Sequence, residues 1–178
     1  MSHTVRETRL PGWTVAVMVL LVILVILMGG AIALLWSQIQ VEIRRQVLGK
    51  NELSALGVLH SLYIAETKFQ ASCYADSDKD GVGDYGTLEQ LLNLDGMGKA
   101  PALSDTTLGA GEKNGYVFTV VVTQQKGDTK PAYRVLADPL SPGRTGYLRY
   151  YLDESGIIRY TADGTLPTVS STPVEQGR

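Results

Sequence analysis

The most constraining feature of this 178-residue chain is an uncharged apolar run near its start, residues 15–36 (VAVMVLLVILVILMGGAIALLW). A helix rises about 1.5 Å per residue and the hydrocarbon core of a bilayer is about 30 Å thick, so roughly 20 such residues cross it. The apolar region of a secretory signal peptide is shorter, about 7–15 residues, and ends at a small-residue cleavage site. This run ends in Leu35 and Trp36. We therefore expect a retained transmembrane helix over residues 13–36, after a short leader or cytoplasmic segment, residues 1–12.

The flanking charges do not orient this helix, because positive residues lie on both sides of it. Arg6 and Arg9 precede the run, and Arg44, Arg45 and Lys50 follow it, so the positive-inside rule does not discriminate. The simplest topology leaves the short N-terminus inside. It predicts a single-pass protein of the inner (cytoplasmic) membrane with an extracytoplasmic C-terminal domain. About 140 residues remain for that domain, enough for one modest core.

Composition argues against several classes of function. The net charge is -2, and no basic run indicates a nucleic-acid partner. Cys73, the single cysteine, excludes an intrachain disulfide and is expected to be buried or half-buried. The two histidines, His3 and His60, have no evident nucleophile partner, and no glycine-rich phosphate motif occurs. We expect no enzyme activity.

Residues 37–74 contain no proline and repeat apolar residues every three or four positions, which predicts an amphipathic continuation of the helix. Gly49 weakens this prediction locally, and a break over residues 49–51 is plausible. The expected apolar face comprises Ile39, Ile43, Val47, Leu56, Leu59, Tyr63 and Phe69. The expected polar face comprises Glu42, Arg45, Lys50, Glu52 and Lys68.

Residues 75–114 are expected to hold an Asp/Gly-rich loop, a short helix and a second loop. Thr87 is a fair N-cap with Gln90 three residues later, a weak capping box that begins a helix over residues 87–94. The residues from 95 onward are rich in Gly, Ala, Pro and Ser, which is typical of a loop.

The spacing of apolar residues changes after residue 115, where β-branched and aromatic residues become frequent. Strands are predicted at 116–122, 132–140, 147–153 and 157–162, the last two joined as a hairpin through residues 154–156. The tyrosines of these runs are expected to pack the sheet rather than bind a ligand. The polar tail, residues 163–178, predicts disorder. The fold class expected is α+β: a long N-terminal transmembrane-plus-amphipathic helix packed on a small antiparallel sheet, residues 115–162.

The stretch DSDKDGVGDYGTL, residues 76–88, resembles a calcium loop in its spacing. Calcium takes six to eight oxygens, and in the EF-hand these come from alternate positions of a tightly turning loop. Gly81 stands where that loop turns sharply, whereas the twelfth position, usually glutamate, is Thr87. The expected ligands are Asp76, Asp78, Asp80, the Val82 carbonyl, Asp84 and, two residues late, Glu89.

Two interpretations of this stretch remain open. One is a structural calcium site of weak affinity, with Kd about 10⁻⁴–10⁻³ M as in extracellular modules. The other is an acidic, glycine-rich linker that binds nothing measurable. We favour calcium, because clustered aspartates repel each other unless a cation lies among them.

The order of these elements resembles the type IV pilin superfamily, including the pseudopilins of type II secretion. The segment LPGWTVAVMVLL, from Leu10, resembles a prepilin processing site, which implies cleavage between Gly12 and Trp13. AETKFQASC followed by YGTLEQLL resembles the end of the pilin helix and its following loop, and YLRYYLDESGIIRYTADG resembles the terminal hairpin. The resemblance spans nearly the whole chain, although each motif alone has low specificity.

This resemblance implies a structural or assembly subunit of an envelope filament or secretion machine. Its partners would be the membrane and, through the N-terminal helix, other copies or other pilin-like subunits. Two positions depart from the family pattern. Pro11 stands where Lys or Arg usually precedes the glycine, and Val17 stands where a glutamate usually pairs with a neighbour's N-terminal amine. The alternative is a single-pass anchored subunit of a larger envelope complex that does not form filaments.

Overall fold

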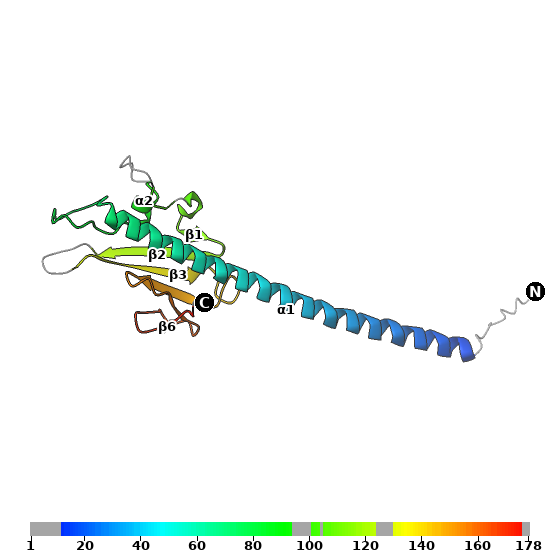
Figure 1. Cartoon of the computed structure of the whole chain (residues 1–178). Coiled ribbons are helices and arrows are strands. Elements are labelled where there is room, and N and C mark those ends of the chain that lie inside the picture. The colour runs from blue at the N-terminus through cyan, green and yellow to red at the C-terminus, as the bar shows by residue number, and fades with distance from the viewer. Residues whose placement is uncertain (1–11, 94–100, 104, 124–129, 176–178) are drawn as a thin grey trace, which may run out of the picture. The chain divides into compact units, whose positions relative to one another are not determined.

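A computed structural model describes residues 12–93, 101–103, 105–123 and 130–175 (Figure 1). The chain divides into two compact units, residues 1–44 and 45–178. The helix α1 (Gly12–Ala71) belongs to both, so its residues 12–44 and 45–71 are described separately.

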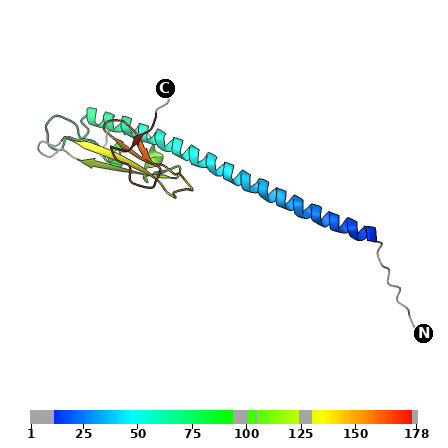
Figure 2. The same ribbon diagram turned by 90° about the horizontal axis from the view of Figure 1, so that it is seen from below.

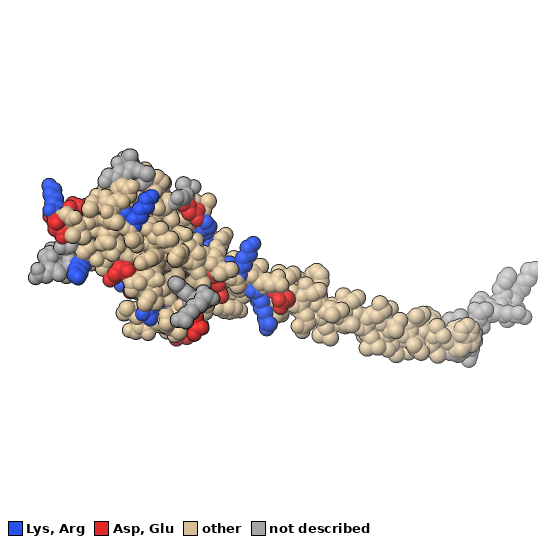
Figure 3. All heavy atoms as spheres, in the orientation of Figure 1, with Lys and Arg blue, Asp and Glu red and all other residues tan. Residues whose placement is uncertain are grey.

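Residues 12–44 of α1 are a helix whose large apolar side chains are all exposed. Trp13, Leu24 and Leu34 keep 68%, 50% and 69% of their surface. None of the most apolar part of α1 is buried, unlike the core helix of a soluble protein. Figure 3 shows the greater part of this stretch as a surface without charged side chains, and its charged residues, Glu42 and Arg44, come at its end. Within the described residues, α1 is the one helix long and apolar enough to cross a membrane, which agrees with the predicted anchor.

Residues 45–71 of α1 continue without interruption, which corrects the break considered at residues 49–51. Gly49 and Gly57 have no atom within 4 Å of a hypothetical Cβ, so both face open space. The helix ends at Ala71, earlier than the expected residue 74. Cys73 there adopts a left-handed φ of 47°, a conformation that stops a helix.

A six-stranded antiparallel sheet lies in the second unit, and its strands follow one another in sequence order, β1 to β6. Figures 1 and 2 show it beside the last turns of α1. The strands are β1 (Glu112–Lys113), β2 (Tyr116–Thr123), β3 (Ala132–Pro139), β4 (Arg149–Asp153), β5 (Arg159–Thr161) and β6 (Thr172–Pro173).

One core joins α1 to this sheet, because each element buries one face. Alternate strand residues point inward with the period of two expected for a half-buried sheet. The strands contribute Tyr116, Phe118, Tyr133, Val135, Ala137, Tyr150 and Leu152. The helix contributes Ala55, Val58, Leu59, Leu62, Ala65 and Phe69, spaced three or four apart. This arrangement confirms the α+β fold class.

The predicted apolar face of the helix is correct only in its second half. Leu59 and Phe69 are buried, and Leu56 and Tyr63 are partly buried against the core. In contrast, Ile39, Ile43 and Val47 are exposed. The helical period is the same throughout, but the sheet covers only the later turns.

Short elements account for the other differences. The helix α2 (Leu88–Leu91) has the predicted capping box at Thr87, but it ends at Leu91, before the expected residue 94. The 3-10 helix η1 (Thr106–Leu108) and β1 occupy part of the expected second loop. The tail, expected to be disordered, contains β6, where the Val174 N–H donates to the Ile158 carbonyl at 2.8 Å.

Candidate functional site

The Asp loop, defined here as residues 76–84, begins five residues after α1 ends and folds around its own carboxylates. Asp76 accepts the N–H groups of Asp80 at 3.2 Å and Gly81 at 3.1 Å. Asp80 accepts the Val82 N–H at 2.7 Å. Gly81 has φ +83°, a left-handed conformation that favours glycine, so the predicted sharp turn is present.

Three of the predicted metal ligands come together in this loop. One carboxylate oxygen from each of Asp76, Asp78 and Asp80 lies within 4.8 Å of the others. Desolvation raises the pKa of the Asp78 carboxyl, and the negative charges of Asp80 and Asp76 raise it further. Carboxylate oxygens are the donors that a hard divalent cation prefers, so the three side chains suit calcium chemically. The other oxygens of a complete shell would come from backbone or solvent.

The remaining predicted ligands are not part of that group. Asp84 is 3% exposed, and it accepts the Ser77 N–H at 2.8 Å, closing the loop instead. Glu89 lies exposed on α2. The Val82 N–H is engaged by Asp80, and a role for the Val82 carbonyl stays a prediction.

The Asp loop returns onto the C-terminal end of α1 through close backbone contact. The Asp84 N–H donates to the Ala75 carbonyl at 2.8 Å. A Cβ on Gly83 would lie 2.0 Å from the Gln70 carbonyl oxygen, so only glycine fits there without a shift. The far end of the loop is therefore fixed against the helix.

A buried glutamate makes the next contact along the chain. Glu66 of α1 is fully buried, and its Oε2 accepts the Gly86 N–H at 2.9 Å. Burial raises the pKa of Glu66 to about 8, although the hydrogen bond from Gly86 opposes this shift. Glu66 is not among the predicted site residues. Its spacing, four residues after Leu62 and three before Phe69, does place it on the buried face.

A second set of polar contacts ties an earlier turn of α1 to the segment before β4. Glu52 Oε1 accepts the N–H groups of Tyr147 at 2.8 Å and Leu148 at 3.3 Å. Asn51 donates its side-chain N–H to the Thr145 carbonyl at 2.9 Å. Glu52 thus faces the sheet domain, which corrects its assignment to the polar outer face.

The other residues of interest lie apart from the Asp loop or at its margin. Trp13 is 68% exposed and α1 begins at Gly12, whereas Pro11 and the leader lie outside the described residues. Cys73 is exposed, which corrects the expectation that it is buried. The left-handed backbone of Cys73, rather than its thiol, ends the helix.

No family model, no curated protein and no solved structure matches this chain. The architecture defines it as an α+β protein with one N-terminal helix apolar enough to anchor it in a membrane. The pilin-like assignment therefore remains a prediction from the sequence motifs.

Proposed function

We propose that this protein is a pilin-like structural or assembly subunit of a cell-envelope filament or secretion machine. The observation that carries the proposal is a single helix with two environments. Residues 12–44 of α1 expose apolar side chains, and residues 45–71 pack on an antiparallel meander. A helix of this kind can leave the lipid and re-bury the same side chains against neighbouring helices.

The proposed location is the inner (cytoplasmic) membrane, with a single pass and an extracytoplasmic domain. Before assembly the apolar turns of α1 lie in lipid, where every backbone N–H and C=O is satisfied within the helix. After assembly the same turns contact other copies or related subunits. The role proposed for this protein is structural and not enzymatic.

An alternative function is an anchored subunit of a larger envelope complex without filaments. Val17 favours it, because an apolar residue stands where the pilin pattern has a glutamate that pairs with a neighbour's amine. Both functions use the same anchor, and they differ in what contacts residues 12–44.

The N-terminus of the protein from its native membrane tests the pilin-like function. Mass spectrometry is expected to find a product that begins at Trp13, and Gly12→Leu is expected to abolish it. Pro11→Lys, which restores the residue usual in the family, should increase processing. An intact N-terminus in all three proteins would rule out a processed pilin. Stable co-purification of unlike subunits without filaments would then support the alternative.

Calcium at the Asp loop is a separate proposal with a structural role at the junction between α1 and the rest of its unit. At 10 mM calcium, a Kd of about 10⁻⁴–10⁻³ M stabilises the folded state by about 1.4–2.7 kcal/mol. The melting temperature of the detergent-solubilised protein should therefore rise on going from EGTA to calcium. The double variant D78N/D80N should lose this rise, and E112Q, at an exposed position of β1, should keep it. Equal melting temperatures in EGTA and calcium would contradict the proposal.

A further inference from the structure

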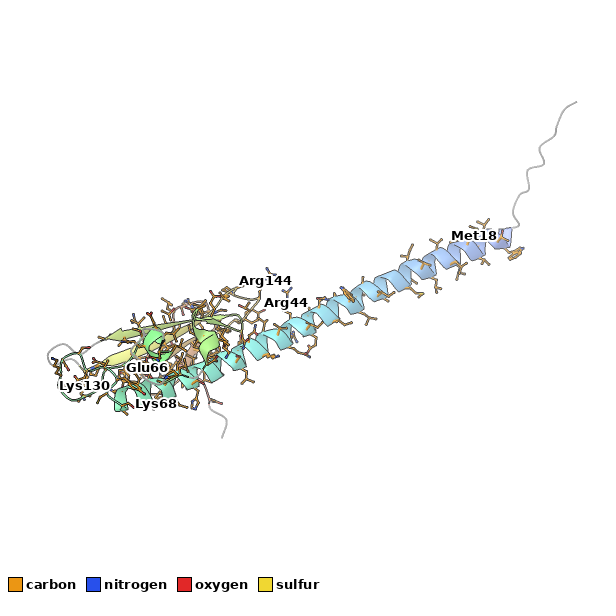
Figure 4. The ribbon with its side chains drawn as sticks, turned by 90° about the horizontal axis from the view of Figure 1, so that it is seen from above. Met18, Arg44, Glu66, Lys68, Lys130 and Arg144 are labelled. Carbon is orange, nitrogen blue, oxygen red and sulfur yellow. The ribbon has the colours of Figure 1, made fainter. Side chains whose placement is uncertain are left out.

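Glu66 is a buried acid that joins two segments of the second unit. Its side chain is 0% exposed, in the layer between α1 and the sheet. Figure 4 labels it there, close to the exposed Lys68 of the same helix. Its one hydrogen bond in the described structure reaches Gly86, between the Asp loop and the N-cap of α2. The bond thus fastens the segment of residues 84–86 to α1.

The surroundings of Glu66 favour the neutral acid over the carboxylate. Glu66 interacts electrostatically with Tyr85 of the following loop and Tyr133 of β3, and Tyr63 of α1 acts on both of these tyrosines. Two further charges act on this cluster, Asp153 on Tyr133 and Glu154 on Tyr85. Both are negative.

Glu66 forms no ion pair with the described residues. The two ion pairs there, Lys113–Asp105 and Arg149–Asp138, do not involve it. Arg134 pairs across the sheet with Asp153 and acts on Tyr151. An ionised carboxylate without a cationic partner is costly in such a place.

The hydrogen bonding of this cluster is also incomplete, because two of its buried oxygen atoms lack a partner. Glu66 Oε1 and the Tyr133 hydroxyl are both buried and make no hydrogen bond to the described residues. A carboxylic acid can donate as well as accept, whereas a carboxylate only accepts. Oε1 has no partner in either form of Glu66, and burying an unpartnered charge costs more than burying an unpartnered neutral group, so the neutral acid is favoured.

We propose that Glu66 is a proton-operated latch: the neutral acid holds residues 84–86 on α1, and loss of its proton releases that segment. Ionisation places a negative charge among tyrosines and away from water. The charge reaches solvent most easily when residues 84–86 lift off the helix, because they cover it and lie at the end of a loop. The released segment includes Asp84 and ends just before the N-cap of α2, so the Asp loop loses its fixed end.

The direction of the pH effect follows from the two protonation equilibria. The folded protein holds this proton up to about pH 8, whereas the unfolded chain releases it near 4.5. Stability from the buried neutral acid is fully present below about pH 4.5 and is lost as the pH rises through about 8. The latch is therefore closed in acid and opens in alkali.

Hydrogen exchange on the full-length protein in detergent micelles with EDTA tests the latch between about pH 6 and pH 9. After correction for chemical exchange, protection of the Gly86 amide should fall up to about tenfold per pH unit from pH 6 to about 8 and level off above that pH. A peptide from β2 should keep its protection over the same range. In E66Q the side-chain amide oxygen can still accept the Gly86 N–H but carries no charge. Protection of the Gly86 amide in this variant should therefore not depend on pH. E112Q should behave as the wild type.

Equal pH dependence in E66Q and the wild type would overturn the proposal, as would equal loss of protection in β2 and Gly86. Infrared spectroscopy of the wild type gives a second measurement that needs no variant. A carbonyl band of a protonated carboxylic acid should be present at pH 6 and disappear as the pH rises through about 8. Absence of that band at pH 6 would equally refute the latch.

Discussion

Residues 12–44 and 45–71 of α1 share one helical conformation and differ in what their apolar side chains contact. In the first stretch the large apolar residues are exposed, and the first charged side chain is Glu42. In the second stretch one face, including Leu59 and Leu62, is completely buried against the sheet. Helical periodicity alone therefore does not specify burial. The partner, lipid or sheet, decides which residues need to be apolar.

The polar contacts differ in the same way. In the second stretch Asn51, Glu52 and Glu66 form hydrogen bonds to segments far away in sequence. In the first stretch, the Ser37 hydroxyl donates a hydrogen bond to the Leu34 carbonyl of the same helix at 2.7 Å. Long-range polar contacts thus fix the position of the second stretch on its sheet, and a membrane helix has no need of them.

The largest effect is expected from removing a buried side chain of the second stretch. Leu59→Ala should destabilise the second unit by about 2–5 kcal/mol, because it removes a fully buried side chain and leaves a cavity. Urea unfolding in detergent, followed by tyrosine fluorescence, measures this loss. Leu34→Ala, at a position 69% exposed, is the matched control and should leave the midpoint unchanged. Similar losses in both variants would contradict the difference between the two stretches.

An added charge is expected to be costly in the first stretch of α1 and tolerated in the second, which is the reverse of the effect of shortening a leucine. Leu24→Arg should make membrane insertion less favourable by about 2.5–3.5 kcal/mol, because the arginine would lie near the middle of the apolar run. Leu53→Arg lies in the second stretch at a position 71% exposed and should be tolerated. Carbonate extraction of membranes that contain each variant compares them. Retention of Leu24→Arg at the wild-type level would count against a membrane-spanning helix.

A smaller effect is expected at the polar contact with the segment before β4. Glu52→Ala deprives the Tyr147 and Leu148 N–H groups of their acceptor, with a loss of about 1–3 kcal/mol in unfolding free energy. Chemical denaturation at neutral pH measures it. Glu112→Ala removes an acid from an exposed position and serves as the control. A Glu52→Ala protein as stable as the control would show that water replaces the carboxylate at no cost.

The smallest effect concerns the cap of α2. Thr87→Ala should cost about 1 kcal/mol, because the Gln90 N–H loses its side-chain acceptor. Thr87→Ser retains the hydroxyl and should be close to the wild type. Differential scanning calorimetry can resolve the difference between them. Identical unfolding temperatures would indicate that tertiary packing, rather than the capping box, maintains α2.

Much of this fold follows from local patterns, since the long helix, the four longer strands and the cap at Thr87 are all predictable from spacing and residue type. β1 and β6 are not, because a strand of two residues is too short to show a period and is defined only by its pairing with β2 or β5. The grouping of Asp76, Asp78 and Asp80 follows from alternation around a turn. The closing role of Asp84 does not, because it depends on how the loop meets α1. Glu66 could have been found from its position on the buried face.

The two edges of the sheet have a consequence for how copies of this protein meet. β1 and β6 are two residues long, and Pro173 in β6 has no N–H to donate. Short edge strands and proline protect a sheet against edge-to-edge pairing with another chain. Strand addition at β1 or β6 therefore gains few backbone hydrogen bonds. Residues 119–123 of β2, by contrast, pair with β3 alone among the described strands, so this part of the edge is the one open to a further strand.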